Sequence, residues 1–545
     1  GNLDMTAHMA EATLPILYFE YDGEYLNPSY GHTGEIDASC LRGGILPLDE
    51  ERVLHIALEK YNAEIQTVSY EVRSADMERL IQNGEIEDLE ETGQYVNGMI
   101  RVKDLLEDSE EYVLALRVGM KDERSAQYFV RIANSDYELI EKCTTFAKEF
   151  HEATLNPHNT YPITQYLETD TSRTQTSLAY ADIQSKYRTI IWDGMLVEES
   201  QAPMVTYLEL NPDVVSLNLD YQVIYENEKG EKETYKVRDY FRVRQANMRM
   251  YLLDYERTMD EIFGAQKDSF SNDKINLGIT EEAVSMVESE GGKNLAFINA
   301  NRLFVYSNTE SKLSEVFSFY DKHNFDARTL NRNFDIKILK MEDSGNLAFV
   351  IAGYMNRGIH EGEVGIAVYF YDTIQNTIEE QIFIPYKKSA DVLIKELNEL
   401  CYLNMENHLF FILGGALYDV NLESKNYEIL ISDLTEDIYK VSKSGRMISW
   451  LMEKKPYESR TLYWLNLNDG KQLEIKSGYQ QYITVLGFMG EDLIYGVVNT
   501  EDVQRDVDGS ILFPVDRLLI RNNDDKILKS YQKEDCYIIG CNIVD

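Results

Sequence analysis

The sequence predicts a mainly β protein in which N-terminal β-sandwich modules are followed by a β-propeller of at least five blades. Three observations predict this fold class. Short alternating apolar segments separated by polar turns fill residues 12–134 and recur over 184–265. A single long stretch between these blocks has helical spacing. A pattern of about 50 residues then repeats from 275 to 545.

Composition limits the function classes before any motif is considered. The chain has 545 residues, of which 44% are hydrophobic and 11% aromatic, enough for several packed cores. It carries 53 Lys and Arg against 94 Asp and Glu, a formal net charge of −41. A polyanion repels nucleic acid and anionic membranes, so neither is an expected partner.

Cysteine use and chain ends bear on location. The five cysteines are scattered, so no disulfide framework or zinc site is predicted. No stretch approaches the roughly 18 apolar residues of a membrane span. The first residue is Gly rather than Met, which is typical of a processed or recombinant fragment. We expect an extracellular or cell-surface protein whose N-terminal signal or anchor is missing from this chain.

The N-terminal region predicts a flexible tail over 1–11 and a β-sandwich over 12–134. Residues 66–73 alternate polar and apolar side chains, as a half-buried strand does. The segment LLEDSEEYVLALRV (105–118) resembles the late strands of fibronectin type III and immunoglobulin-like modules. This resemblance covers one hairpin and implies an Ig-like fold for the sandwich.

Residues 135–183 predict a linking helix and a connector. Ser135 and Glu138 have the spacing of a capping box, and apolar residues follow at helical intervals until Asn156-Pro157. We expect an amphipathic helix over 136–154, packed between domains.

Residues 184–265 predict a second sandwich-like block. Its strongest segment alternates strictly from Val215 to Tyr225. A polar stretch, Gln266–Lys274, then predicts a linker.

The repeat over 275–545 is the strongest signal in the sequence. Each copy has a short apolar strand followed by a second strand that ends in Asn or Asp. Steps of 52, 62, 38 and 46 residues separate the anchor positions of these apolar strands, which are Leu295, Leu347, Leu409, Met447 and Leu493. Four short strands per repeat of this length predict propeller blades.

The repeat pattern resembles uncharacterised exported bacterial β-propeller proteins with N-terminal Ig-like modules, a group without a defined function. The resemblance implies a fold and an exported location but no chemistry. The last residues, 538–545, align with 485–492, so we expect one extra strand at the chain end. That strand either closes a five-bladed ring or begins a blade that continues in the natural protein; we favour the second reading.

Strong catalytic and nucleotide-binding motifs are not found in the sequence. The most unusual segment is the loop 353–363, which is expected to join the second and third strands of the second blade. It is read either as a ligand-binding loop at one rim or as a longer surface hairpin. Its candidate ligand-binding residues are Tyr354, Asn356, Arg357, His360, Glu361 and Glu363.

Asp506 and Asp508 precede a glycine, as in the start of a calcium loop, but no downstream bidentate Glu follows. A simple Asp-Gly hairpin turn is the alternative. Calcium is the one cofactor that the sequence suggests.

These observations favour a non-enzymatic extracellular or surface-anchored binding or scaffold protein that presents its propeller to a protein or polysaccharide partner. Two alternatives remain open. One is a carbohydrate-active enzyme of the glycoside hydrolase type, which needs only a carboxylate pair in the propeller. The other is the sensory ectodomain of an envelope regulator.

Overall fold

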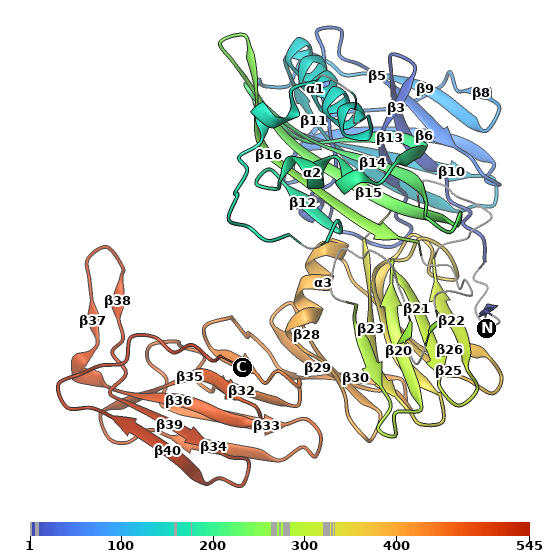
Figure 1. Ribbon diagram of the computed structural model, residues 1–545. Coiled ribbons are helices and arrows are strands. Elements are labelled where there is room, and N and C mark those ends of the chain that lie inside the picture. The colour runs from blue at the N-terminus through green and yellow to red at the C-terminus, as the bar shows by residue number, and fades with distance from the viewer. Residues whose placement is uncertain are drawn as a thin grey trace. The chain divides into compact units, whose positions relative to one another are not determined.

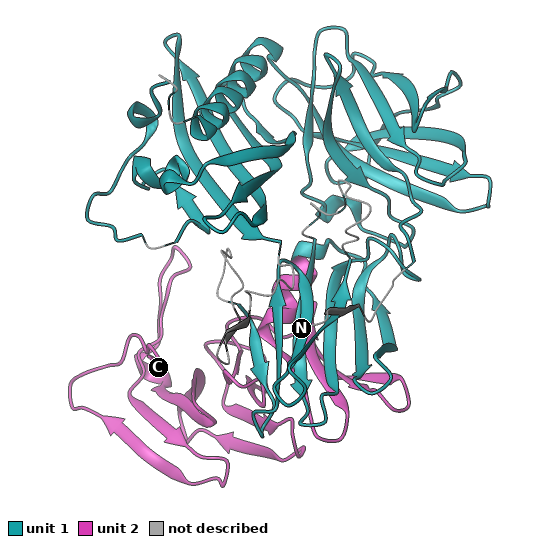
Figure 2. Ribbon diagram, turned by 45° about the vertical axis from the view of Figure 1, so that its right-hand side comes forward, with its two compact units in different colours: residues 1–391 teal, residues 392–545 magenta. Residues whose placement is uncertain are grey.

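The computed structural model describes residues 3–5, 10–156, 158, 161–175, 177–262, 270–271, 274–275, 284–319, 328, 331 and 333–544. Strands hold 52% of the residues and helices 9%, which confirms the mainly β fold class. The chain divides into two compact units, residues 1–391 and 392–545 (Figure 2). None of the described helices has the length and apolar character needed to cross a membrane. Most of the predicted linker Gln266–Lys274 lies outside the described residues.

The first module is a sandwich of two five-stranded sheets (Figure 1). One sheet has the order β3-β2-β5-β9-β8 and the other β4-β11-β10-β6-β7. Both sheets contribute buried side chains to one core, among them Leu17, Ile56, Leu114 and Val130. The strands are β2 (Ile16–Tyr21), β3 (Glu24–Tyr30), β4 (Ile45–Leu48), β5 (Val53–Glu59), β6 (Ile65–Ser74), β7 (Leu80–Glu85), β8 (Glu90–Thr92), β9 (Tyr95–Arg101), β10 (Tyr112–Met120) and β11 (Ser125–Asn134).

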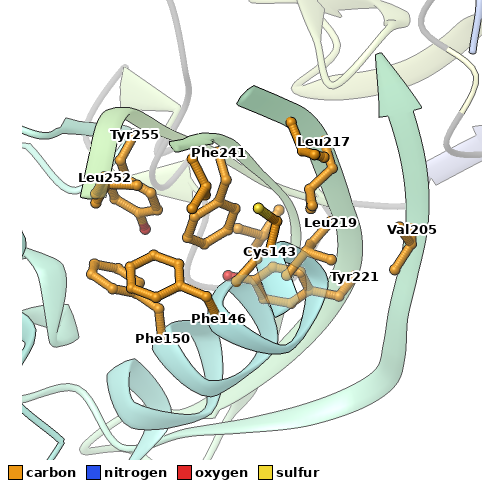
Figure 3. Packing of buried hydrophobic residues seen from close by; sticks show 14 of the residues in the cluster. Cys143, Phe146, Phe150, Val205, Leu217, Leu219, Tyr221, Phe241, Leu252 and Tyr255 are labelled. Atoms are coloured by element: carbon orange, nitrogen blue, oxygen red, sulfur yellow. The ribbon is translucent and has the colours of Figure 1, made fainter. Parts of the chain in front are cut away.

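The second module is a single curved sheet in the order β12-β16-β15-β14-β13, with helix α1 (Tyr137–Leu155) packed on its apolar face. Its strands are β12 (Tyr180–Asp182), β13 (Val197–Leu210), β14 (Val214–Glu226), β15 (Lys232–Ala246) and β16 (Arg249–Glu261). Figure 3 shows Phe146 and Phe150 of α1 directed toward Phe241 and Tyr255 of the sheet.

This arrangement differs from the predicted second sandwich, because a helix takes the place of the second sheet. Alternation along β14 shows that one face is buried, but it carries no information about what covers that face. The helix also begins one residue later than the capping box predicts. Asp136 is the N-cap, and its side chain accepts a hydrogen bond from the Leu139 backbone N–H at 3.3 Å.

The described part of the repeat region forms five sheets, each with four antiparallel strands from one repeat. The first two lie in the first unit: β19 (Met286–Glu288), β20 (Asn294–Asn299), β21 (Arg302–Ser307) and β22 (Lys312–Ser318), then β23 (Phe334–Met341), β24 (Leu347–Tyr354), β25 (Val364–Asp372) and β26 (Thr377–Pro385). Helix α3 (Ala390–Glu399) follows.

The second unit holds the other three sheets. They are β27 (Cys401–Leu403), β28 (His408–Leu413), β29 (Ala416–Asn421) and β30 (Asn426–Ile431); β31 (Tyr439–Val441), β32 (Met447–Leu451), β33 (Thr461–Asn466) and β34 (Gln472–Lys476); and β35 (Gln481–Met489), β36 (Asp492–Asn499), β39 (Arg517–Arg521) and β40 (Ile527–Gln532). All five anchor positions of the sequence repeat lie in the second of the four strands of their repeat.

Both chain ends differ from the sequence prediction. Strand β1 (Leu3–Met5), within the tail expected to be flexible, pairs in parallel with β22. The extra strand expected over 538–545 is not formed in the described residues up to 544. Ile538 makes a single bridge to Val515, and Ile539 and Val544 are largely exposed. A repeated sequence becomes a strand only where a partner edge supplies hydrogen bonds.

Candidate functional site

The predicted ligand-binding loop connects β24 to β25, as expected, and it contacts the first sandwich. The Tyr354 hydroxyl donates a hydrogen bond to the Gly31 carbonyl at 2.5 Å. The Glu361 carboxylate accepts hydrogen bonds from the backbone N–H groups of Thr13, at 2.8 Å, and Leu14, at 2.9 Å. These two side chains therefore hold the second four-stranded sheet against the sandwich.

The other four predicted residues of the loop fall into two groups. Asn356 and Arg357 are buried, and the Arg357 Nε donates to the Asn356 Oδ1 at 3.4 Å. His360 lies between two carboxylates, with Nδ1 at 3.2 Å from Glu363 and Nε2 at 2.6 Å from Glu380. Glu363 also lines a cleft of about 230 Å³. A ligand at this loop stays a prediction.

Asp506 and Asp508 lie in the turn of a hairpin between β37 (Gln504–Arg505) and β38 (Ile511–Leu512). The Asp508 carboxylate accepts a hydrogen bond from the Ser510 backbone N–H at 2.9 Å, which is the geometry of a turn. In the described part of the chain, no three His, Cys, Asp or Glu side chains are grouped so that they could hold a metal ion. Calcium binding stays a prediction.

A different cleft, of about 340 Å³, lies where the first sandwich meets the start of α1 and strand β13. We name it the Tyr21 cleft. Its walls combine tyrosines (Tyr21, Tyr137, Tyr207), carboxylates (Glu20, Asp22, Asp49, Glu51), His55 and an apolar floor that includes Phe19, Leu26, Leu46 and Leu54. This volume lies in the range that accommodates a small organic ligand.

The tyrosine wall of the Tyr21 cleft is made by residues from two elements. Tyr21 ends β2, and Tyr137 is the first residue of α1; their ring centroids are 4.5 Å apart. Asp22 and Gly23 form the two-residue turn between β2 and β3, and both have a positive φ, of 47° and 78°. An Asp-Gly pair favours this type of hairpin turn, which brings Tyr21 and Asp22 to the rim of the cleft.

The Tyr21 cleft is electrically negative. No Lys or Arg side chain is among the described residues that line it. Burial raises the pKa of Tyr21, and the negative charges of Asp22, Glu141 and Asp49 raise that pKa further, because they oppose ionisation of the phenol. Tyr207 closes the inner end, with its hydroxyl 2.7 Å from the Thr144 hydroxyl. An aromatic pair beside carboxylates is suited to hold an ammonium group.

Sequence reasoning did not single out the Tyr21 cleft. Tyr21 and Tyr137 are separated in the sequence by most of the first sandwich, and each lies beside a local feature, the Asp22-Gly23 turn and the Asp136 cap. The capping-box pattern at Ser135 and Glu138 predicted the helix start, and no turn was predicted at Asp22-Gly23. The sequence alone does not predict that Tyr21 and Tyr137 are in contact, because their contact depends on the packing of α1 beside β2.

Among the described residues, three histidines lie beside carboxylates, and each can be compared with the histidine of a catalytic triad. His151 lies 2.7 Å from Glu199 and 3.6 Å from Asp239. His408 lies 2.6 Å from Asp419, and its other ring nitrogen lies 3.3 Å from Asn421. His360 has a carboxylate on each nitrogen. In each of the three, both ring nitrogens face a carboxylate or an amide rather than a hydroxyl or thiol nucleophile, so none has the geometry of a Ser or Cys triad.

Comparison with known proteins gives structural likeness only. No protein-family model matches the chain, and no curated protein matches it. Among solved structures, Porphyromonas gingivalis dipeptidyl peptidase 4 matches at 10% identity and a TM-score of 0.26, over 57% of this chain and 51% of that chain. A post-proline cleaving enzyme from Rickettsia typhi matches at 11% identity and a TM-score of 0.26, over 63% and 45%.

A third match is the extracellular domain of a putative one component system from B. thetaiotaomicron, at 8% identity and a TM-score of 0.23, over 98% of this chain and 78% of that chain. The chain thus spans about half the length of the two peptidases. Likeness at this level concerns the fold alone.

The comparisons correct one expectation from the sequence. We expected a non-enzymatic binding or scaffold protein because no catalytic motif was found. Peptidases are among the solved structures that match. The lack of a recognisable motif in a chain of this β-rich type is therefore no ground for a non-enzymatic assignment, and that expectation is wrong.

Proposed function

We propose that the chain recognises an organic ammonium compound, as substrate or ligand, in the Tyr21 cleft. The observation that carries this proposal is the tilted Tyr21–Tyr137 ring pair beside the carboxylates of Asp22 and Asp49. Aromatic faces attract a cation through their quadrupole, and carboxylates attract its charge and accept hydrogen bonds from any N–H groups that it carries. The apolar floor suits the carbon chain that carries the ammonium group.

Two sources could supply this chemistry, the free amino end of a short peptide and a quaternary amine. The experiment is isothermal titration calorimetry of the full chain with trialanine, with N-acetyl-trialanine and with choline. Trialanine and its acetylated form differ in the ammonium charge at otherwise similar size. We expect trialanine to bind and its acetylated form to bind at least about tenfold more weakly, because the charge carries the recognition.

Matched variants locate the site. Tyr21→Leu keeps an apolar side chain but removes the aromatic face, and Asp22→Asn removes a charge at similar volume. Tyr479→Leu is the control, since Tyr479 is 89% exposed and lies far along the chain from the cleft residues. Ammonium binding that is weakened by both cleft variants and unchanged in the control supports the proposal. Equal binding in Tyr21→Leu and Tyr479→Leu contradicts it.

The same samples test for a reaction. Mass spectrometry of trialanine incubated with the full chain detects cleavage. The calorimetric titration with choline shows whether a quaternary amine is preferred. Binding of choline without binding of trialanine identifies a quaternary amine as the ligand. Equal affinities for trialanine and N-acetyl-trialanine, together with no binding of choline, overturn ammonium recognition in either form.

A further inference from the structure

A second cavity lies in the first unit, between the sheet of the second module and the first two four-stranded sheets. Its volume is about 40 Å³. Gln222 of β14 and Lys236 of β15 face it from one side, as cross-strand neighbours. Arg302 at the start of β21, Arg328 and Asn356 face it from the other side. We name it the Gln222 cavity.

The lining of the Gln222 cavity has the opposite charge to the molecule as a whole. Three cationic side chains, Lys236, Arg302 and Arg328, line it, and no carboxylate is among its described lining residues. Neighbouring groups hold both guanidinium groups in place. Arg302 lies 3.4 Å from Glu315, and Arg328 lies over the Tyr61 ring, 4.2 Å from its centroid. Arg302 and Arg328 are buried, and a buried charge attracts an anion more strongly than an exposed charge does, because water screens it less.

A buried amide points to an occupant. Gln222 is 7% exposed, and its Nε2 has no hydrogen-bond partner among the described residues. Asn299, which ends β20 and precedes the lining residue Ala300 in the chain, is 2% exposed, and neither its Nδ2 nor its Oδ1 has a partner among the described residues. A buried polar group without a partner costs roughly 1–3 kcal/mol, so native proteins seldom leave such groups unmatched.

We propose that the Gln222 cavity binds a small oxyanion. A volume of about 40 Å³ has room for a single anionic group and not for a whole metabolite. Guanidinium groups present forked N–H donors that match carboxylate and phosphate oxygens, and the Gln222 amide supplies a further N–H. The bound oxyanion joins β14 and β15 to β21, and so it links the second module to the repeat region within the first unit. This site is separate from the Tyr21 cleft and does not depend on the function proposed there.

The test is calorimetric titration of the full chain with inorganic phosphate, with acetate and with chloride at constant ionic strength. Phosphate represents a tetrahedral oxyanion and acetate represents a carboxylate. Chloride has no oxygen atoms and measures charge attraction alone. We expect an oxyanion to bind more tightly than chloride and to raise the thermal unfolding midpoint, since a ligand that binds only the folded state stabilises it. This titration uses the unmodified chain.

Variants then place the binding. Lys236→Met removes one cation of the cavity, and Gln222→Leu removes the amide at similar size. Lys232→Met is the matched control, because Lys232 is an exposed residue of the same strand. We expect phosphate affinity to fall at least tenfold in Lys236→Met, to fall in Gln222→Leu, and to stay unchanged in Lys232→Met.

Three results overturn the proposal: no measurable binding of phosphate or acetate, equal binding of chloride and phosphate, or equal loss in Lys236→Met and Lys232→Met. The last result would mean that the anion binds the surface rather than the cavity. A variant that does not fold, judged by circular dichroism, is replaced by the other variant of the cavity.

Discussion

The pKa of His151 lies above its ordinary value, although its side chain is 2% exposed. Burial lowers the pKa of His151, but the carboxylates of Asp239 and Glu199 outweigh burial and raise that pKa to about 9. The Tyr221 hydroxyl donates to Asp239 at 3.0 Å and keeps that carboxylate in place. Because His151 belongs to α1 and both carboxylates belong to the sheet, the imidazolium joins the helix to the sheet by charge.

His151 should therefore stabilise the second module in a pH-dependent way. Its folded pKa, about 9, lies above its ordinary value of 6.5. The stabilisation is complete below pH 6.5 and is lost as the pH rises through about 9. This difference between the two pKa values corresponds to a contribution of about 3 kcal/mol at most to the free energy of unfolding.

The variant His151→Gln tests this expectation. The thermal unfolding midpoint of the variant should lie well below that of the parent chain at about pH 6, and the gap should narrow at about pH 9.5. His158→Gln, an exposed histidine, serves as control and should show no gap at either pH. A gap that is constant with pH would mean that packing rather than charge explains the contribution of His151.

At the scale of one element, the strand β24 depends on Gly353. Its φ is 132°, a conformation that residues with a side chain rarely adopt. A Cβ at this position would lie 2.2 Å from the Asn333 carbonyl oxygen and 2.6 Å from the Phe334 Cα, both of them backbone atoms. The neighbouring strand β23 therefore leaves no room for a methyl group.

Gly353→Ala should destabilise the first unit by more than about 3 kcal/mol, because both the backbone conformation and the contact with β23 oppose it. The denaturant midpoint measures this effect. Gly43→Ala is the control, since nothing lies within 4 Å of a Cβ there. Equal denaturant midpoints for the two variants would show that β23 moves aside with little loss of stability.

The loop between β24 and β25 gives a second element-scale prediction. Glu361→Ala removes an ionised acceptor from the backbone N–H groups of Thr13 and Leu14, and it should cost about 2 kcal/mol. Amide hydrogen exchange at residues 13 and 14 should become faster, whereas the exposed Glu379→Ala should leave it unchanged. Unchanged exchange in Glu361→Ala would mean that these amides are protected by burial alone.

Elements that depend on local patterns were predictable, and elements that depend on distant partners were not. The anchors of the repeat, such as Leu347 and Leu409, lie in the second strands of their sheets because alternation and turns are encoded locally. The role of Glu361 depends on Thr13, 348 residues away, and the Tyr21–Tyr137 pair depends on the packing of α1. The sequence predicted Glu361 as a ligand-binding residue and gave no indication of the Tyr21–Tyr137 pair.

At the scale of the whole molecule, the net charge of −41 favours binding of the cation proposed for the Tyr21 cleft and opposes binding of the anion proposed for the Gln222 cavity. The overall field raises the local concentration of cations and lowers that of anions. Salt screens this field over a Debye length that shrinks from about 30 Å at 0.01 M to about 3 Å at 1 M. The carboxylates of Asp22 and Glu51 at the Tyr21 cleft are exposed, whereas Arg302 and Arg328 at the Gln222 cavity are buried.

Raising the salt concentration should therefore change the two affinities differently. The Kd of trialanine should rise several-fold between about 20 mM and about 500 mM sodium chloride, because the long-range attraction and the exposed carboxylates are both screened. The Kd of phosphate should change much less, because screening removes a repulsion while the buried cations keep their attraction. Calorimetry at both salt concentrations measures the two values. Parallel weakening of trialanine and phosphate would mean that both bind at exposed charges, and it would place the oxyanion outside the Gln222 cavity.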